Sequence, residues 1–257
     1  MLHEILLSLS GHPSPLLTAS HTTPTSIFSP PEQALLSSLA HLSTLHRKLL
    51  TYTATIASSH PSSICQAVAT AISSTHLAQF QRKIIEVEEG ILRKDAGSVG
   101  AYSIVPLTAV VGEFAPWTRR MDWFLEVVEF MAKGGGAAGG AGGERKCSGA
   151  MIIDRLCNAM KTGYVDIEEA ALSLVRVAET AWLKQVSAWV LYGRLPSFGK
   201  EDFFVHEIEG PVGFPRRQLV ECQGFLMGNR NMKAKRSCFP RLSRHRRLLR
   251  YYSLAAR

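Results

Sequence analysis

A glycine-rich run is the feature of this sequence that comes nearest to a cofactor motif. Gly134, Gly136 and Gly139 have the spacing G-x-G-x-x-G, in which glycines let a backbone approach a pyrophosphate at a helix N-terminus. That fingerprint needs a preceding strand and an acidic residue about 20 residues later, whereas this run follows a predicted helix in low-complexity Gly/Ala sequence. Lys146 is not part of a Gly-Lys-Ser/Thr triplet, so a P-loop is not indicated. We therefore expect residues 133–143 to be a flexible surface loop.

Histidine and glutamate side chains are the next groups that could do chemistry. His41 and His46 are five residues apart on a predicted helix, a spacing that does not place two imidazoles side by side. We expect both to be surface histidines. Glu168 and Glu169 are adjacent, so they point in different directions on a helix and are expected on its solvated face. None of these patterns predicts a catalytic residue.

The cysteines do not have the spacing of a metal site. The chain contains Cys65, Cys147, Cys157, Cys222 and Cys238. This odd number includes no C-x-x-C pair and no accompanying histidines of a zinc site. We expect buried or incidental thiols in a reduced, intracellular compartment. The sequence therefore predicts no metal, no cofactor, no small-molecule substrate and no enzymatic activity.

Apolar residues recur at three- and four-residue steps over most of the chain, which is the period of an amphipathic helix. The clearest stripe runs from Glu32 to Ala57, after Pro30 and Pro31, where a helix can start. A second helix is predicted to begin after Pro61 and to end before Gly97. No segment shows sustained period-two alternation. The predicted fold class is all-α, an elongated helical bundle with short connections and a Gly-rich loop.

Prolines are expected to interrupt this pattern in two places. His12 to Pro31 is rich in Ser, Thr and Pro and is predicted to be a loose connection after a short amphipathic helix at Met1 to Leu9. The apolar region from Tyr102 to Met131 contains Pro106 and Pro116. Because proline removes a helix donor and clashes with the preceding turn, two shorter helices are predicted there.

A last pair of helices is predicted over Cys147 to Lys161 and Ile167 to Tyr192. Gly163 lies between them and would suit the left-handed position that follows a helix end. Trp182 and Trp189 are seven residues apart and share one helix face. Large aromatic residues at this spacing are expected in the core.

The positive charge of the chain is concentrated at its end. The net charge is +8 over 257 residues, but residues 216–257 hold 12 Lys or Arg against the single acidic Glu221, a net +11. Residues 1–215 therefore carry a net charge of −3. The positive net charge of the whole chain thus says little about its helical part. Two interpretations of the tail stay open. The favoured one is a non-homologous tail from a shortened gene model, and the other is a polybasic segment for phosphates or acidic surfaces.

No membrane segment is predicted. The longest apolar stretch, Ile104 to Trp117, is interrupted by Glu113 and is shorter than the roughly 20 residues that span a bilayer. The opening Met1 to Leu9 lacks the basic n-region and the small-residue cleavage site of a signal peptide. Neither stretch indicates a membrane as a partner.

Two stretches of the sequence resemble a known family. Residues 1–15, MLHEILLSLSGHPSP, predict a short helix that leads into a Gly-x-Pro turn. Residues 183–195, LKQVSAWVLYGRL, followed by Glu201-Asp-Phe-Phe204, combine a Trp-bearing helix, a glycine stop and a Phe-Phe segment. Together they resemble the gamma-tubulin complex component family of the spindle pole body, and within it the branch of component 4. The candidate motif and packing residues are Leu6, Gly11, Pro13, Trp189, Gly193, Phe203 and Phe204.

The resemblance implies both a domain organisation and a function. It covers residues 1–208 as a helical N-terminal domain, followed over 209–257 by a basic tail that is disordered or non-homologous. In this family the N-terminal domains pack side by side in a ring or spiral on which gamma-tubulin templates microtubules, and a C-terminal domain contacts gamma-tubulin. The chain is shorter than family members, so a truncated form is expected.

The expected function is that of a non-catalytic scaffold. The resemblance implies microtubule nucleation at the spindle pole or another microtubule-organising centre in the cytoplasm. Its expected partners are other gamma-tubulin complex components, with gamma-tubulin bound only indirectly. Two alternatives remain. The basic tail could bind nucleic acid or acidic protein surfaces, or the chain could be a truncated product without gamma-tubulin binding.

Overall fold

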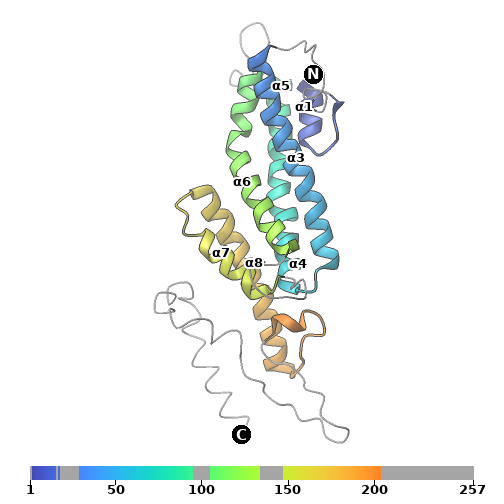
Figure 1. Cartoon of the computed structure of the whole chain (residues 1–257), viewed down its shortest axis with the longest axis vertical. Coiled ribbons are helices and arrows are strands. Elements are labelled where there is room, and N and C mark those ends of the chain that lie inside the picture. Colours follow the sequence, from blue (N-terminus) through green and yellow to red (C-terminus); the bar gives the residue numbers. More distant parts are fainter. Residues whose placement is uncertain (1, 16, 18–28, 95–104, 134–146, 204–257) are drawn as a thin grey trace, which may run out of the picture. The chain divides into compact units, whose positions relative to one another are not determined.

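The computed structural model describes residues 2–15, 17, 29–94, 105–133 and 147–203, and the regular structure in these residues is helical (Figure 1). The α-helices are α1 (Leu2–Leu9), α3 (Pro30–Ser59), α4 (Ser63–Ala71), α5 (Ala78–Arg93), α6 (Leu107–Lys133), α7 (Gly149–Ala159) and α8 (Val165–Tyr192). A π-helical turn, Ile72–Leu77, joins α4 to α5, and a 3-10 turn spans Lys200–Asp202. The prediction of an all-α helical bundle is confirmed.

The helices pack around a shared apolar core. The chain divides into two compact units, Met1–Asp202 and Phe203–Arg257, and the helices of the described residues lie in the first. Within it α3 packs along α6. The chain reverses direction after α3, so that α4 also lies beside α3 (Figure 1). The α1 helix packs on α3 and α5, whereas α7 and α8 form a pair that also contacts α4. Among the described residues of this unit, the phenylalanines Phe80, Phe114 and Phe124 are fully buried.

The two clearest helical stripes of the sequence form helices where predicted. The stripe at Glu32 to Ala57 lies within α3, which has proline at its first turn. The backbone N–H of Ser29 donates to the Glu32 carboxylate at 2.9 Å, as in a capping box. This hydrogen bond lowers the pKa of Glu32. The second stripe forms α4, the π-helical turn and α5 in one continuous run.

The prediction that Pro116 divides its region into two helices is wrong. The α6 helix continues through Pro116 from Leu107 to Lys133. A proline removes the hydrogen bond to the carbonyl of the residue four positions earlier, here Gly112. Both Pro116 and Gly112 are exposed, so that carbonyl can be solvated by water. Burial of the opposite face of α6 against α3 then outweighs the local cost.

The last pair of helices is confirmed as α7 and α8. Gly163, in the turn between them, has a φ of +75°, so it occupies the predicted left-handed position. Glu168 and Glu169 are exposed, as expected. The predicted loose connection over His12 to Pro31 lies mostly outside the described residues, and so does the Gly-rich loop over 133–143 apart from Lys133, which ends α6.

His46 corrects the expectation of two surface histidines. His41 is exposed and lies 3.4 Å from the Asp122 carboxylate, but His46 has no exposed surface. Its Nδ1 donates to the carbonyl of Leu9, the last residue of α1, at 2.8 Å. Its ring also packs against Phe80, with 5.1 Å between the centroids. A buried histidine needs such a partner from elsewhere in the chain, which helical spacing alone does not reveal.

A second buried histidine lies in the π-helical turn. Nε2 of His76 is 2.9 Å from Oγ of Ser173 on α8, and its ring lies 4.8 Å from that of Phe124. Burial, with the charge of Arg120 as a smaller cause, lowers the pKa of His76 to about 4. Burial also lowers the pKa of His46. Both residues therefore pack as neutral imidazoles.

We expect the free energy of unfolding to fall by about 2 kcal/mol through His76 alone between pH 7 and pH 5. The unfolded state, with an ordinary histidine pKa of 6.5, binds the proton more readily than the folded state, whose pKa is about 4. Stability is thus lost as pH falls below 6.5. His60 opposes this trend, because a hydrogen bond with Cys65 raises its pKa. Urea unfolding at both pH values should show a smaller pH effect in His76→Gln, and an equal effect in both proteins would contradict the assignment.

Candidate interaction groove

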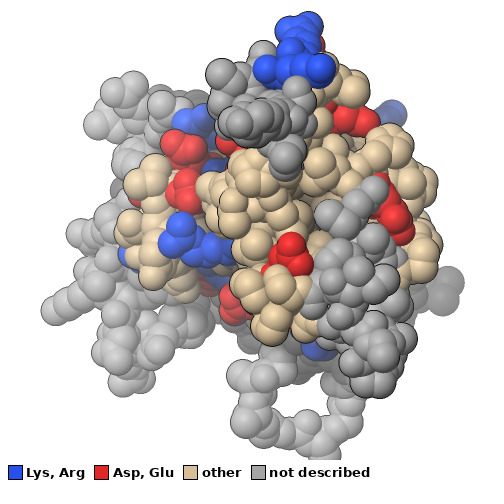
Figure 2. Space-filling model, turned by 90° about the horizontal axis from the view of Figure 1, so that it is seen from above, with Lys and Arg blue, Asp and Glu red and all other residues tan. Residues whose placement is uncertain are grey.

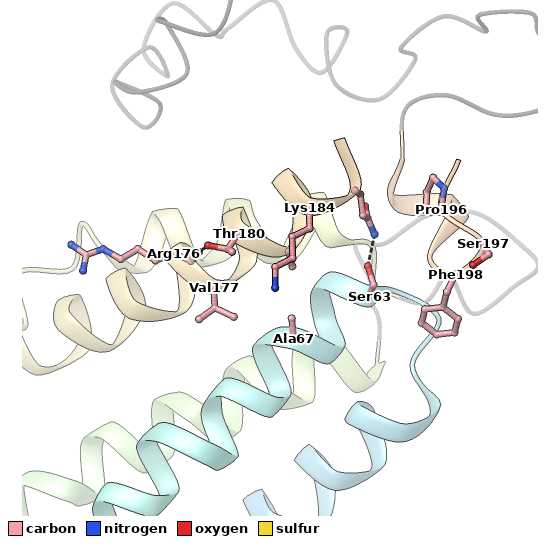
Figure 3. Close-up of a pocket in the computed structure, with 11 residues that line it drawn as sticks. Ser63, Ala67, Arg176, Val177, Thr180, Lys184, Pro196, Ser197 and Phe198 are labelled. Atoms are coloured by element: carbon pink, nitrogen blue, oxygen red, sulfur yellow. Dashed lines mark hydrogen bonds between the residues drawn. The ribbon is translucent and has the colours of Figure 1, made fainter. Parts of the chain in front are cut away.

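A groove with a volume of about 570 Å³ lies between the start of α4, the middle of α8 and residues 196–198 (Figure 3). Its lining includes Ser63, Ala67, Arg176, Val177, Lys184 and Phe198. The Lys184 and Val177 side chains point from α8 toward Ala67 on α4 (Figure 3). A hydrogen bond from Nε2 of Gln185 to Oγ of Ser63 joins the two helices beside the groove.

Asp202 holds the chain segment that forms one wall of this groove. Its Oδ1 accepts a hydrogen bond from the backbone N–H of Gly149, at the start of α7, at 2.7 Å. Its Oδ2 accepts from Oγ of Ser62 at 2.5 Å, and Ser62 caps the start of α4 by accepting from the N–H of Cys65 at 3.2 Å. A carboxylate is favoured at helix N-termini. One side chain therefore ties the 3-10 turn to two helices.

Two glycines allow the close approach of these segments. Gly199 has a φ of +70°, and a Cβ there would lie 3.2 Å from the backbone nitrogen of Ser63. A Cβ on Gly149 would lie 2.5 Å from Cδ1 of Ile64 and 3.1 Å from Cγ of Asp202. A side chain at either position would displace the groove wall or the start of α7.

We expect Asp202→Ala to lower the free energy of unfolding by about 2 kcal/mol, because the buried Gly149 N–H and Ser62 hydroxyl lose their acceptor. The control is Asp154→Ala, which removes an exposed carboxylate from α7. Urea denaturation followed by circular dichroism should separate the two variants. Equal midpoints would show that Asp202 does not anchor these helices.

The tryptophans of α8 are not in the core, which corrects the sequence-based expectation. The buried residues of α8 end at Ala178, and both Trp182 and Trp189 are half-buried. Beyond Ala178 the helix carries exposed apolar side chains, of which Leu191 and Tyr192 are 71% and 73% exposed. Trp182 and Trp189 do lie on one helix, as their spacing predicts, but other parts of the chain bury them only partly.

The candidate residues near the N-terminus lie where α1 packs on α3. Leu6 is buried, and Oγ of Ser8 lies 2.9 Å from Oγ of Ser43 on α3. Gly11 has a φ of +112°, and a Cβ there would lie 3.4 Å from Cδ1 of Leu50. Pro13 is exposed. Leu6 and Gly11 are thus placed to support the turn after α1.

Two of the other candidate residues, Trp189 and Gly193, lie at the end of α8. Gly193 adopts the left-handed conformation, with a φ of 64°, and its N–H donates to the carbonyl of Trp189 at 2.9 Å. Phe203 is buried, and Phe204 lies outside the described residues. Asp202 was missed by the sequence reasoning, although it lies in the same Glu201-Asp-Phe-Phe204 stretch. A helix-capping carboxylate whose partners are 53 and 140 residues away has no local signal.

The described cysteines are buried thiols, as predicted. Cys65, Cys147 and Cys157 are free and buried. A hydrogen bond with Cys147 and burial raise the pKa of the Cys65 thiol far above its usual value, so Cys65 is not activated as a nucleophile. The same interaction lowers the pKa of the Cys147 thiol. Cys222 and Cys238 lie outside the described residues, and within the described ones no cluster of three metal-ligating side chains occurs.

The surface carries mixed charge on the face shown in Figure 2, where Lys and Arg side chains are interspersed with Asp and Glu among uncharged residues. The basic tail over 209–257 lies outside the described residues. None of the described helices is sufficiently long and apolar to span a membrane.

The helical region matches a known protein family. The family described as "Gamma tubulin complex component N-terminal" matches residues 2–212. None of the curated proteins compared with the chain matches it. The family match includes the described helices from α1 to α8 and, apart from Met1, both stretches on which the resemblance was based. The chain therefore belongs to the gamma-tubulin complex component family.

Proposed function

We propose that this chain is a structural scaffold of the gamma-tubulin complex, in which its helical domain packs laterally against neighbouring components. Members of the family act in microtubule nucleation as parts of that complex, at microtubule-organising centres of the cytoskeleton. The observation that carries the proposal is the family match over residues 2–212. The helices in that range share one core, as a rigid spacing element requires.

The proposal extends to the domain boundary, the branch and the cellular site. We place the end of the scaffold domain near Ile208, ahead of the basic tail over 209–257. The branch is that of component 4, on the resemblance of residues 1–15 and 183–195. Neighbouring complex components are the direct partners, gamma-tubulin is reached through them, and the site is the spindle pole or another organising centre.

Affinity capture from cell extract tests this proposal. We expect the full chain and a shortened chain ending at Ile208 both to recover gamma-tubulin complex components, at physiological and at raised salt. A Phe114→Asp variant, which places a carboxylate in the core, should recover none. If the folded shorter chain recovers no component, the scaffold proposal fails. If only the full chain captures material, and only at low salt, the basic tail is responsible.

A further inference from the structure

We propose that the groove between α4 and α8 binds an acidic amphipathic helix of a partner protein. This interaction is distinct from lateral packing between complex components and does not depend on it. The proposal rests on the charge of the groove, its apolar floor and its fixed wall.

The charged side chains that line the groove are both cationic. They are Arg176 and Lys184, both on α8 and both exposed. Neither forms an ion pair with another residue in the part of the chain that the structure describes. Eight residues of α-helix separate them by about 12 Å along the axis. Two carboxylates spaced by two turns on a partner helix would match this separation.

Between the two cations the groove is mainly apolar. Val177 and Ala67 form part of its floor, and Phe198 is 51% exposed at its edge. Its volume of about 570 Å³ lies within the range of preformed ligand sites. An apolar helix face that enters such a groove is a recurrent mode of peptide recognition.

The groove is held in place before any partner binds. Asp202 ties one wall to the starts of α4 and α7, and Gln185 bonds Ser63 across the two helices. A preformed wall lowers the ordering cost of binding. The chain's own basic tail, with a net charge of +11 over 216–257, has the same sign as Arg176 and Lys184. It therefore lacks the complementary charge that a groove occupant needs.

Fluorescence anisotropy with the full chain and labelled peptides tests the proposal. The first probe is a helical peptide of about 18 residues, with leucines along one face and glutamates beside them. The second probe replaces each glutamate by lysine. The third keeps the glutamates but replaces the leucines by serine, and so reports simple attraction to the basic tail. We expect only the first to bind the full chain at raised salt.

Charge reversal locates the binding site. Arg176→Glu combined with Lys184→Glu should weaken binding of the glutamate peptide about tenfold and should permit binding of the lysine peptide. The control, Arg47→Glu with Lys48→Glu, makes the same change in net charge on an exposed part of α3. It should leave the affinity unchanged.

Four results would overturn the proposal. The first is no binding of the glutamate peptide to the full chain. The second is an equal loss of affinity in the two double variants, which would place the peptide elsewhere. Equal binding of the serine peptide would show attraction to the tail alone. The fourth is self-association of the chain that protects the groove and that the double variant Arg176→Glu, Lys184→Glu loses, as measured by sedimentation. This result would identify a second copy of the chain as the occupant of the groove.

Discussion

Replacement of Phe80 by alanine is expected to lower the free energy of unfolding by about 4 kcal/mol. Phe80 has no exposed surface and joins three helices. From α5 its ring contacts His46 on α3 and both Phe114 and Trp117 on α6, with centroid separations of 5.1, 5.9 and 5.2 Å. Removing the ring leaves a cavity that α3, α5 and α6 cannot close without moving apart. Urea denaturation followed by far-UV circular dichroism measures the loss.

The matched comparison is Trp189→Ala, which removes a larger aromatic side chain from outside the core. Because Trp189 is half-buried, we expect a loss of only about 1 to 2 kcal/mol. Had Trp189 been a core residue, as its spacing suggested, the loss would be about 3 to 5 kcal/mol. A Trp189→Ala effect as large as that of Phe80→Ala would contradict the described packing of α8.

Replacement of Gly149 by valine is expected to lower the free energy of unfolding by about 3 kcal/mol. Gly149 starts α7, where a Cβ would meet Cδ1 of Ile64 at 2.5 Å and Cβ of Ile64 at 3.0 Å. The added side chain must therefore push α7 away from α4 and disturb the hydrogen bond from the Gly149 N–H to Asp202. The expected result is a lower urea midpoint and loss of peptide binding in the neighbouring groove.

Gly112→Val provides the control for this substitution. Gly112 is an exposed helical glycine with nothing within 4 Å of an added Cβ, so valine there should change stability by no more than about 0.5 kcal/mol. Because valine is a better helix former than glycine, similar losses at Gly112 and Gly149 would mean that valine destabilises both sites for a reason other than contact with Ile64. The close contact between α4 and α7 would then not be established.

The sequence predicts those elements of the fold whose causes are local. The stripe that forms α3 repeats over many turns, and Pro30 marks its start, so both its existence and its position follow from the pattern. Gly193 ends α8 through a left-handed backbone conformation that glycine favours, and Gly163 adopts the same conformation in the turn between α7 and α8. The predicted break at Pro116 is wrong because it ignores how α6 packs. That packing leaves the helix face with Pro116 exposed to solvent, which makes the lost hydrogen bond tolerable.

The candidate groove was not predictable in the same way. Its floor combines α4 with α8, and its wall depends on the hydrogen bond between Ser62 and Asp202, which are 140 residues apart. Nothing in the spacing of either residue indicates the other. The buried position of His46 has the same origin, since its partner is the end of α1. Such features follow from tertiary packing, whereas the family resemblance was carried by short local motifs.

Sedimentation velocity with purified proteins tests the scaffold account most directly. The shortened chain ending at Ile208 is mixed at raised salt with the N-terminal domain of another gamma-tubulin complex component, and separately with purified gamma-tubulin. The account predicts a faster-sedimenting complex with the component domain and none with gamma-tubulin. Salt-resistant binding of gamma-tubulin, with no complex formed by the component domain, would contradict it.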